Sequence, residues 1–140
     1  MRVLIDTPVW SLALRRKTRE LPTSERRVVQ VLQQIVEEGR AQLLGPVRQE
    51  LLSGLREDAQ VRRLRDYLRD FPDVVLATGD YEEAARAGNE CRRAGIVSTP
   101  VDMLICAVGL HHGWQIFSTD RDFPHYATVL PIQLFSLAQA

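Results

Sequence analysis

Acidic residues from separated segments are the part of this sequence best suited to chemistry, and the set is Asp6, Glu50, Asp102 and Asp120. If these carboxylates converge without basic partners, each raises the pKa of the others and destabilises the fold unless a cation binds. Oxygen-only ligands favour Mg²⁺ or Mn²⁺ over zinc. Such a cation lowers the pKa of a bound water and neutralises charge on a phosphate. The set therefore predicts hydrolysis of phosphodiester bonds.

Strand and helix signals alternate along the chain, and they determine whether the acids meet. Short apolar runs predict strands over residues 2–6, 41–44, 74–77, 115–118 and 128–132. Helical spacing and start signals predict helices over residues 8–14, 24–38, 47–55, 58–70, 80–93 and 100–111, the last being the most buried. This alternation predicts an α/β fold, a three-layer sandwich in which helices flank a central, mostly parallel sheet.

The carboxyl edge of that sheet is where the acids should gather, because ligands of open parallel sheets bind beyond the carboxyl ends of the strands. Asp6 ends the first strand and Asp120 follows the strand at 115–118, so both are expected at this edge. Asp102 lies in the first turn of the helix before that strand. Glu50 lies at the margin of its helix's apolar stripe. Neither of these two has to face solvent.

Each acid also has a purely structural explanation. Asp6 could be a turn residue, and Glu50 could be a solvated helix residue. Asp102 stands at the third position of a capping pattern that begins at Thr99, which accounts for it fully. The acidic turn at 120–122 lacks the glycine and glutamate of a calcium-binding loop. Residue types and spacing leave both interpretations open.

The turn after the strand at 115–118 contains two candidate acids, Asp120 and Asp122. Phe123 needs an apolar environment, so we expect the chain to turn at Asp120 with Phe123 as its anchor. Asp120 then faces the metal. Asp122 is expected to cap the turn by accepting backbone N–H groups, as aspartate commonly does.

Composition indicates one soluble globular domain over residues 1–140, with 45% apolar and 26% charged residues. No apolar run is long enough to span a membrane, and the N-terminal segment lacks the apolar stretch of a secretory signal, so we expect a cytoplasmic protein. The net charge of zero excludes a strongly basic nucleic-acid binder. Any affinity for nucleic acid must be local.

A short cationic stretch after the first helix is one local candidate for binding RNA phosphate, although a solvated loop explains it equally well. Its residues are Arg15, Arg16, Lys17 and Arg19. The two cysteines, Cys91 and Cys106, have no C-x-x-C spacing, which excludes a zinc ribbon and a thioredoxin-like motif. Both are expected in the core.

Four fragments in a fixed order resemble the PIN-domain family, specifically its VapC-like toxins from bacterial toxin–antitoxin pairs. They are VLIDTPVW, VRQELLSGL, STPVDMLICAVGL and IFSTDRDF, and the resemblance extends over nearly the whole chain. Each fragment alone is weakly specific, whereas their order and spacing, with the final T-D-R-D-F string, are more specific.

The resemblance implies an endoribonuclease that uses Mg²⁺ or Mn²⁺ and is inhibited by a cognate VapB-like antitoxin. It carries over the acids of the opening set as the active-site cluster, with Asp6, Asp102 and Asp120 as metal ligands. Thr7 is implied as a supporting hydroxyl, and we assign supporting roles to Thr119 and Asp122 as well. Many relatives have serine where Pro8 stands here, which puts a second hydroxyl contact in doubt but not the metal site. A homodimer is also expected.

Other functions fit the sequence less well. A phosphoaspartate enzyme of the haloacid-dehalogenase type needs a D-x-D motif, and Pro8 occupies the place of its second acid. A receiver domain needs a late lysine, and Lys17 is the single lysine here. The main alternative is an inactive PIN-like module that binds nucleic acid or protein. Attack by metal-bound water would also cleave DNA, so only the resemblance favours RNA.

Overall fold

The central sheet has four strands within residues 1–15 and 17–139, the residues that the computed structural model describes. In sheet order they are β2 (Ala41–Gln42), β1 (Val3–Ile5), β3 (Gln115–Phe117) and β4 (Gln133–Leu134). All pairings among these strands are parallel. Ile5 lies opposite Phe117, so β1 and β3 end level with each other at the carboxyl edge.

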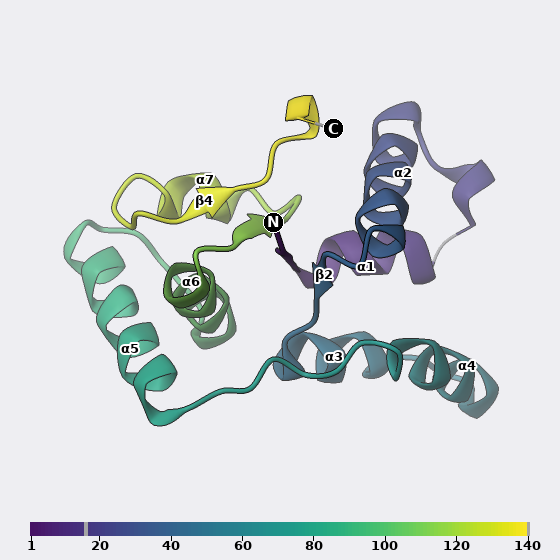
Figure 1. Ribbon diagram of the computed structural model, residues 1–140, viewed down its shortest axis with the longest axis horizontal. Helices are drawn as coiled ribbons and strands as arrows, with labels where there is room; N and C mark the ends of the chain where they lie inside the picture. The colour runs from purple at the N-terminus through teal and green to yellow at the C-terminus, as the bar shows by residue number, and fades with distance from the viewer. Residues whose placement is uncertain (16, 140) are drawn as a thin grey trace.

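Helices surround this sheet. They are α1 (Thr7–Leu14), α2 (Thr23–Glu37), α3 (Gly45–Leu52), α4 (Asp58–Leu68), α5 (Thr78–Arg93), α6 (Pro100–His112) and α7 (Asp122–Tyr126), with 3-10 turns at Thr18–Glu20 and Leu137–Gln139. Figure 1 shows α1 and α2 over one face of the sheet and α5 and α6 over the other, with α3 and α4 beyond β2. The predicted α/β sandwich with a parallel sheet is confirmed. No helix in the described part of the chain is long and apolar enough to cross a membrane.

The core lies between β1, β3 and the helices on both faces. Every residue of β1 is buried, and so is the centre of α6, residues 105–109. Gly109 lets α6 approach the sheet closely, because a Cβ at this position would come within 3.0 Å of the side chain of Ile116. Cys91 and Cys106 are buried free thiols, as predicted.

The strand predicted over residues 74–77 is wrong. Residues 74–77 have no regular secondary structure, and an isolated parallel bridge to Leu43 is formed by Asp73, just before them. Val75 is 85% exposed, so the apolar run does not mark a buried strand. A run of four apolar residues does not by itself provide a neighbouring strand to pair with.

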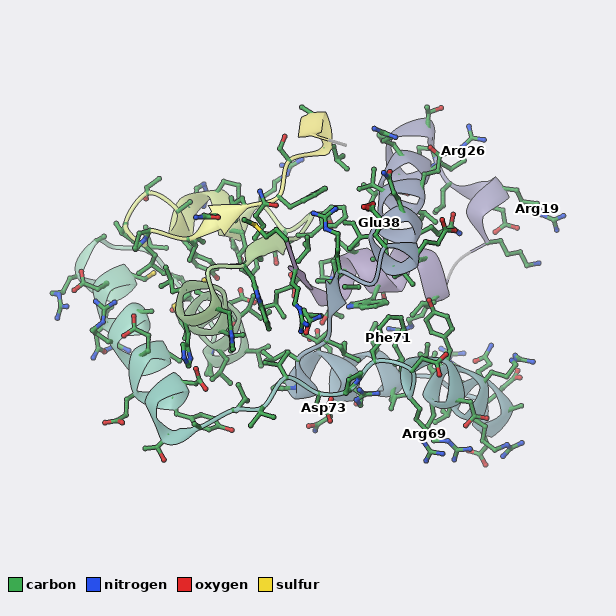
Figure 2. All side chains as sticks on the ribbon, in the orientation of Figure 1. Arg19, Arg26, Glu38, Arg69, Phe71 and Asp73 are labelled. Atoms are coloured by element: carbon green, nitrogen blue, oxygen red, sulfur yellow. The ribbon has the colours of Figure 1, made fainter. Side chains whose placement is uncertain are left out.

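Arg48 and an aromatic contact fix the chain just before this segment. The Arg48 guanidinium donates to the carboxylate of Asp73 at 2.8 Å and to the carbonyl oxygens of Leu68 and Phe71. Figure 2 shows Phe71 between α1 and α4, where its ring centroid is 5.1 Å from that of Trp10. Side-chain packing, rather than a β ladder, therefore holds this connection.

The last strand is also displaced from its prediction. Residues 127–129 form a turn after α7, residue 130 is a bend, and β4 begins only at Gln133. Leu130 is buried, so the apolar run that predicted a strand closes the core instead. Pairing continues past β4, where the backbone N–H of Phe135 donates to the carbonyl of Ile116 at 2.8 Å.

Helix α5 begins at Thr78, two residues before the predicted start at residue 80. Asp80 is the third residue of the helix, and its Oδ2 accepts the backbone N–H of Ala77 at 2.9 Å. Its Oδ1 lies 2.9 Å from Nδ1 of His111, in the last turn of α6. The hydrogen bond from Ala77 and the contact with His111 lower the pKa of Asp80. This buried carboxylate therefore links the start of α5 to the end of α6.

Candidate active site

The carboxyl edge of the sheet carries the predicted acids. Asp6 directly follows β1 and caps α1. Asp120 follows β3, the strand that pairs in parallel with β1. Asp102 lies in the first turn of α6 and Glu50 in α3. Two level strand ends and two helices therefore bring these residues to one side of the molecule.

An open cleft of about 600 Å³ lies at this edge. Its lining consists of Pro46, Gln49, Glu50, Ser53, Thr99, Val101, Asp102, Asp120 and Asp122. Carboxylate oxygens of Asp102, Asp120 and Asp122 lie within 4.8 Å of one another. Among the described residues that line the cleft, every charged side chain is acidic. The cleft therefore attracts cations.

Asp6 lies behind this group. It is 5% exposed, and its Oδ1 accepts the backbone N–H of Thr7 at 2.8 Å. Its Oδ2 accepts the hydroxyl of Ser118 at 2.7 Å. Asp6, Asp102 and Asp120 are the metal ligands predicted from the sequence. The structure groups Asp122 with the latter two and places Asp6 in a buried, hydrogen-bonded position beside them.

Ser118 is a supporting residue that the sequence analysis missed. Besides donating to Asp6, its Oγ accepts the backbone N–H of Asp120 at 3.0 Å, so it joins the two strand ends. Thr119, which was predicted for a supporting role, is exposed. The sequence does contain a signal for Ser118. It is the first polar residue after the buried strand residues Ile116 and Phe117, so it stands at the carboxyl end of β3.

The turn at residues 120–122 is capped differently from the prediction. Oδ1 of Asp120 accepts the backbone N–H of Asp122 at 2.9 Å, so Asp120 performs the capping that was assigned to Asp122. That part of the prediction is wrong, because an aspartate caps the N–H two residues after itself and Asp120 starts the turn. Phe123 is 1% exposed and anchors the turn as predicted. Asp122 instead faces the cleft.

Thr7 joins α1 to the acid on α3. The Thr7 hydroxyl donates to Oε2 of Glu50 at 3.0 Å, and Thr7 itself is buried. The structure thus gives Thr7 the kind of contact expected for a supporting hydroxyl. It also fixes the orientation of Glu50 at the cleft.

Asp102 has both a structural and a site position. Its backbone N–H donates to the Thr99 hydroxyl at 3.1 Å, which confirms the predicted cap. Its carboxylate is not needed for that cap, and Oδ2 accepts the hydroxyl of Tyr126 at 2.7 Å. No local pattern could reveal Tyr126, because the contact depends on where α7 packs. The two explanations of Asp102 are therefore compatible.

Burial and mutual repulsion shift the pKa values at the site. Burial raises the pKa of Asp6 to about 6, with a further contribution from Asp102 and Asp120, against the hydrogen bonds from Ser118 and Thr7. Burial also raises the pKa of Asp102, and the charge of Asp120 acts in the same direction. These shifts have the sign expected for crowded acids without a cation.

The donor set fits a hard divalent cation. Three converging carboxylates supply only oxygen, and the cleft has room for water beside them. Mg²⁺ and Mn²⁺ take carboxylate and water ligands in this way, whereas zinc sites are dominated by nitrogen and sulfur. A divalent ion would also offset the burial and the repulsion by Asp120 that raise the pKa of Asp102.

Of the cationic stretch after α1, Arg15, Lys17 and Arg19 do not line the acidic cleft. Arg15 lines a separate groove of about 510 Å³ between the end of α1 and α4, together with Arg63. Lys17 and Arg19 are exposed, and Figure 2 shows Arg19 pointing away from the body of the protein. Arg16 lies outside the described residues. RNA binding by this stretch stays a prediction.

The sequence matches the model of the PIN domain family over residues 3–129. The chain therefore belongs to the PIN domain family, as the four fragments predicted. A comparison with curated protein sequences finds no significant match.

Solved structures with this fold include complexes from several bacteria. FitAcB from Neisseria gonorrhoeae is 20% identical, with a TM-score of 0.74 and 99% of each chain covered. VapBC2 from Rickettsia felis, bound to a DNA fragment from their promoter, is 15% identical, with a TM-score of 0.70 and coverage of 96% and 98%. A toxin–antitoxin complex from Klebsiella pneumoniae is 18% identical, with a TM-score of 0.65 and coverage of 86% and 89%. At these identities the likeness is one of fold.

Proposed function

We propose that this chain is a metal-dependent endoribonuclease and the toxin of a toxin–antitoxin pair. The observation that carries the proposal is the group formed by Asp102, Asp120 and Asp122, whose oxygens lie within 4.8 Å of one another in an open cleft. Membership of the PIN domain family supports nuclease chemistry. The fold shared with a toxin–antitoxin complex supports the biological role.

The residues around the cleft have distinct roles in this proposal. Asp102, Asp120 and Asp122 would hold Mg²⁺ or Mn²⁺, with Asp6 adding negative charge from behind. When bound, such a cation supplies a water of lowered pKa and neutralises charge on the phosphate. Glu50, oriented by the Thr7 hydroxyl, would accept a proton from the attacking water.

The direct test is cleavage of RNA by the purified chain. We expect cleavage with Mg²⁺ or Mn²⁺, no cleavage with a chelator, and products with 5′-phosphate ends because water is the nucleophile. Products ending in 2′,3′-cyclic phosphate would exclude this mechanism. Asp102→Asn should abolish cleavage while the circular dichroism spectrum stays native.

Single-stranded DNA of the same sequence should be tested in parallel. Attack by water does not need the substrate's 2′-hydroxyl, so the choice of RNA rests on the family resemblance. Faster cleavage of DNA would reassign the substrate but keep the reaction. Absence of cleavage on both would favour the alternative of an inactive PIN-like binding module.

The proposed partner is a small cognate antitoxin of the VapB type. A cytoplasmic ribonuclease without restraint would harm its own cell, and the acidic cleft offers a site where an arginine of the partner takes the place of the metal. Expression of this chain alone should arrest growth, and co-expression of the neighbouring gene should relieve the arrest. Unimpaired growth without any partner would contradict this role.

A further inference from the structure

A second cavity, of about 420 Å³, lies between α5 and α6. Its apolar lining is Ala84, Ala85, Gly88, Met103 and Leu104. Polar side chains also line it, namely Tyr81, Asn89, Arg92 and Ser98. Thr99 lines both this cavity and the acidic cleft, so the two adjoin.

Gly88 keeps this cavity open. A Cβ at Gly88 would lie 3.6 Å from Cγ of Met103 and 4.0 Å from Oγ of Ser98, so any larger side chain would project into the space. Glycine in the interior of a helix is less stable than alanine. Gly88 therefore keeps the cavity open at some cost to the stability of α5.

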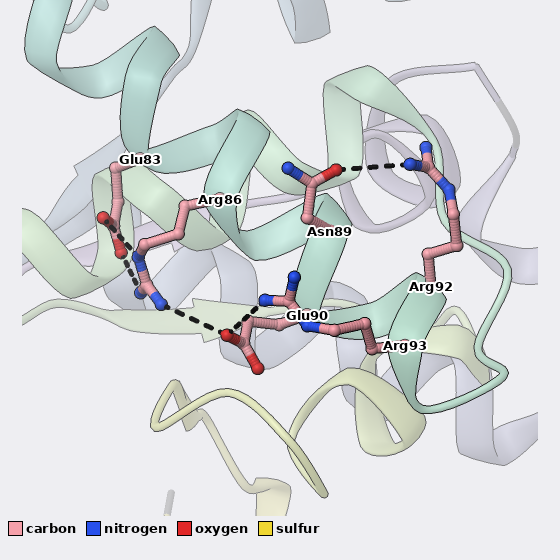
Figure 3. Close-up of polar contacts among 6 residues, drawn as sticks. All are labelled: Glu83, Arg86, Asn89, Glu90, Arg92 and Arg93. Carbon is pink, nitrogen blue, oxygen red and sulfur yellow. Dashed lines mark hydrogen bonds and ion pairs between the residues drawn. The ribbon is translucent and has the colours of Figure 1, made fainter.

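The arginines of α5 differ in their partners, as Figure 3 shows. Arg86 pairs with Glu83 and Glu90, and Arg93 pairs with Glu90 at 2.7 Å. Arg92 instead donates to the side-chain oxygen of Asn89 at 3.2 Å. In the described part of the chain no carboxylate lies within ion-pair distance of Arg92. Its positive charge is therefore available at the cavity.

We propose that this cavity binds a nucleobase of the single-stranded RNA substrate, beside the phosphate at the acidic cleft, with Arg92 contacting the RNA backbone. The inference rests on the proposed nuclease function. Single-stranded RNA is recognised by stacking of splayed bases on aromatic and apolar surfaces and by hydrogen bonds to their edges. The apolar lining, the aromatic side chain of Tyr81, a residue that is 55% exposed, and the amide of Asn89 provide those three elements.

The charge of the cleft gives an independent reason for a neighbouring binding site. Without its cation the acidic cleft repels RNA phosphates, and a cation bound there contacts only the phosphate at the cleft, so affinity for the rest of the substrate must come from elsewhere. The chain has no net charge that would attract RNA from a distance. Affinity must therefore come from an adjoining surface. The α5–α6 cavity lies next to the cleft and contains the cation of Arg92.

Two variants and a matched control test the proposal. Arg92→Ala removes the cation at the cavity, and Ala85→Leu fills the cavity from an exposed position. Arg93→Ala removes the neighbouring cation, which is paired with Glu90. With Mn²⁺ and a short single-stranded RNA, the first two should raise KM by about tenfold at nearly unchanged kcat, the scale of losing one stacking or phosphate contact. Arg93→Ala should leave both constants unchanged.

A methyl resonance gives a readout that does not depend on cleavage. The chain has two methionines, and Met103 lines the cavity whereas Met1 does not. Titration of the metal-free protein with nucleoside 5′-monophosphates should shift the Met103 methyl signal and leave that of Met1 in place. Ala85→Leu should abolish the shift.

The outcomes separate this inference from the proposed function. If RNA is cleaved but both cavity variants behave as wild type and the Met103 signal does not move, the inference is overturned and the nuclease stands. If no RNA is cleaved, the nuclease proposal fails, and the Met103 signal alone decides whether the cavity binds nucleotides. If sedimentation shows that either cavity variant dissociates a dimer, the cavity is an interface between copies of the chain and the inference is overturned.

Discussion

Tyr126 holds one oxygen of Asp102 from α7, an element that is remote in sequence. Burial and the nearby Asp102 carboxylate raise the pKa of Tyr126, so its hydroxyl remains a hydrogen-bond donor at all working pH values. Tyr126→Phe keeps the edge-to-face contact with Phe123, at 5.2 Å between ring centroids, and removes only the hydrogen bond. Loss of a residue that orients a metal ligand lowers metal affinity by about tenfold or more, and we expect that here.

Calorimetric titration with Mn²⁺ measures this effect directly. Tyr67→Phe is the matched control, because Tyr67 is 41% exposed and lies outside the acidic cleft. An unchanged Mn²⁺ affinity in Tyr126→Phe would show that Asp102 is oriented without the hydroxyl.

The two acids of the turn should differ in their structural role but not in their contribution to the metal site. Asp120→Asn and Asp122→Asn should each weaken Mn²⁺ binding and cleavage, because both carboxylates belong to the cluster. Asp120→Ala should additionally lower the free energy of unfolding by about 1 kcal/mol, since it loses the cap to the N–H of Asp122. Asp122→Ala should not.

Metal titration and urea unfolding of these variants distinguish the roles. Full activity of Asp122→Asn would remove Asp122 from the cluster. Full activity of Asp120→Asn with a dead Asp122→Asn would reverse the original assignment of Asp120 as the metal-facing acid.

Asp6 should destabilise the metal-free protein at neutral pH. Its pKa rises from 3.8 to about 6 on folding, so the folded state binds the proton more tightly than the unfolded state does. The contribution of Asp6 to stability is therefore fully present below about pH 4 and is lost as pH rises through about 6. Asp6→Asn should raise the free energy of unfolding at pH 7 by up to about 3 kcal/mol and have little effect at pH 3.5.

Urea unfolding in chelator at these two pH values tests the sign. Asparagine retains an acceptor for the N–H of Thr7 and a donor for Ser118, so the comparison isolates the charge. A variant that is less stable than wild type at pH 7 would mean that the hydrogen bonds outweigh the burial of the charge.

At the scale of elements, α5 and α6 are joined by Asp80. Asp80→Ala removes the cap at Ala77 and the contact with His111, so it should lower the free energy of unfolding at pH 7 by about 1–2 kcal/mol. Because the folded pKa of Asp80 is lowered, its contribution is present above about pH 4 and is lost as pH falls further. Thermal unfolding of Asp80→Ala at pH 7 and pH 3 measures both effects.

Glu82→Ala serves as the control for this helix, because Glu82 is exposed on the same turn. Equal melting temperatures of the two variants at pH 7 would contradict a linking role of Asp80.

The sequence was informative for elements whose signals are local. The apolar runs of β1 and β3 and the amphipathic pattern of α2 predicted these elements, because burial of an apolar stripe decides them. The segments at 74–77 and 128–132 are also apolar, but the first leaves the sheet after the bridge at Asp73 and the second closes the core without forming a strand. Helix α7 was not predicted, since five residues with a proline give no periodic signal.

The same distinction between local signals and distant contacts applies to the candidate site. The carboxyl-edge rule placed Asp6 and Asp120 on one side, because it depends only on strand direction. The hydrogen bonds of Ser118 and Tyr126 depend on side-chain placement across distant elements. These contacts could be found only in the folded structure.

At the scale of the whole molecule, the expected assembly is a homodimer. Val75 is 85% exposed on the segment before α5, an apolar side chain that a second copy could cover. Sedimentation equilibrium of the free chain should give twice the monomer mass of 15.9 kDa. A monomer at micromolar concentration would contradict this expectation.

The pairing of β1 with β3 also has a consequence for the time at which the protein becomes active. Ser118 and Asp6, which hydrogen-bond at the site, are separated by 112 residues. A ribosome adds about 5–20 residues per second, so β1 waits on the order of ten seconds for its neighbour to be synthesised. During that interval the growing chain carries Asp6 and Glu50 but no cluster to bind a cation. The cluster that we propose as the metal site therefore forms only when the last third of the chain folds, and the growing chain should have no cleavage activity before then.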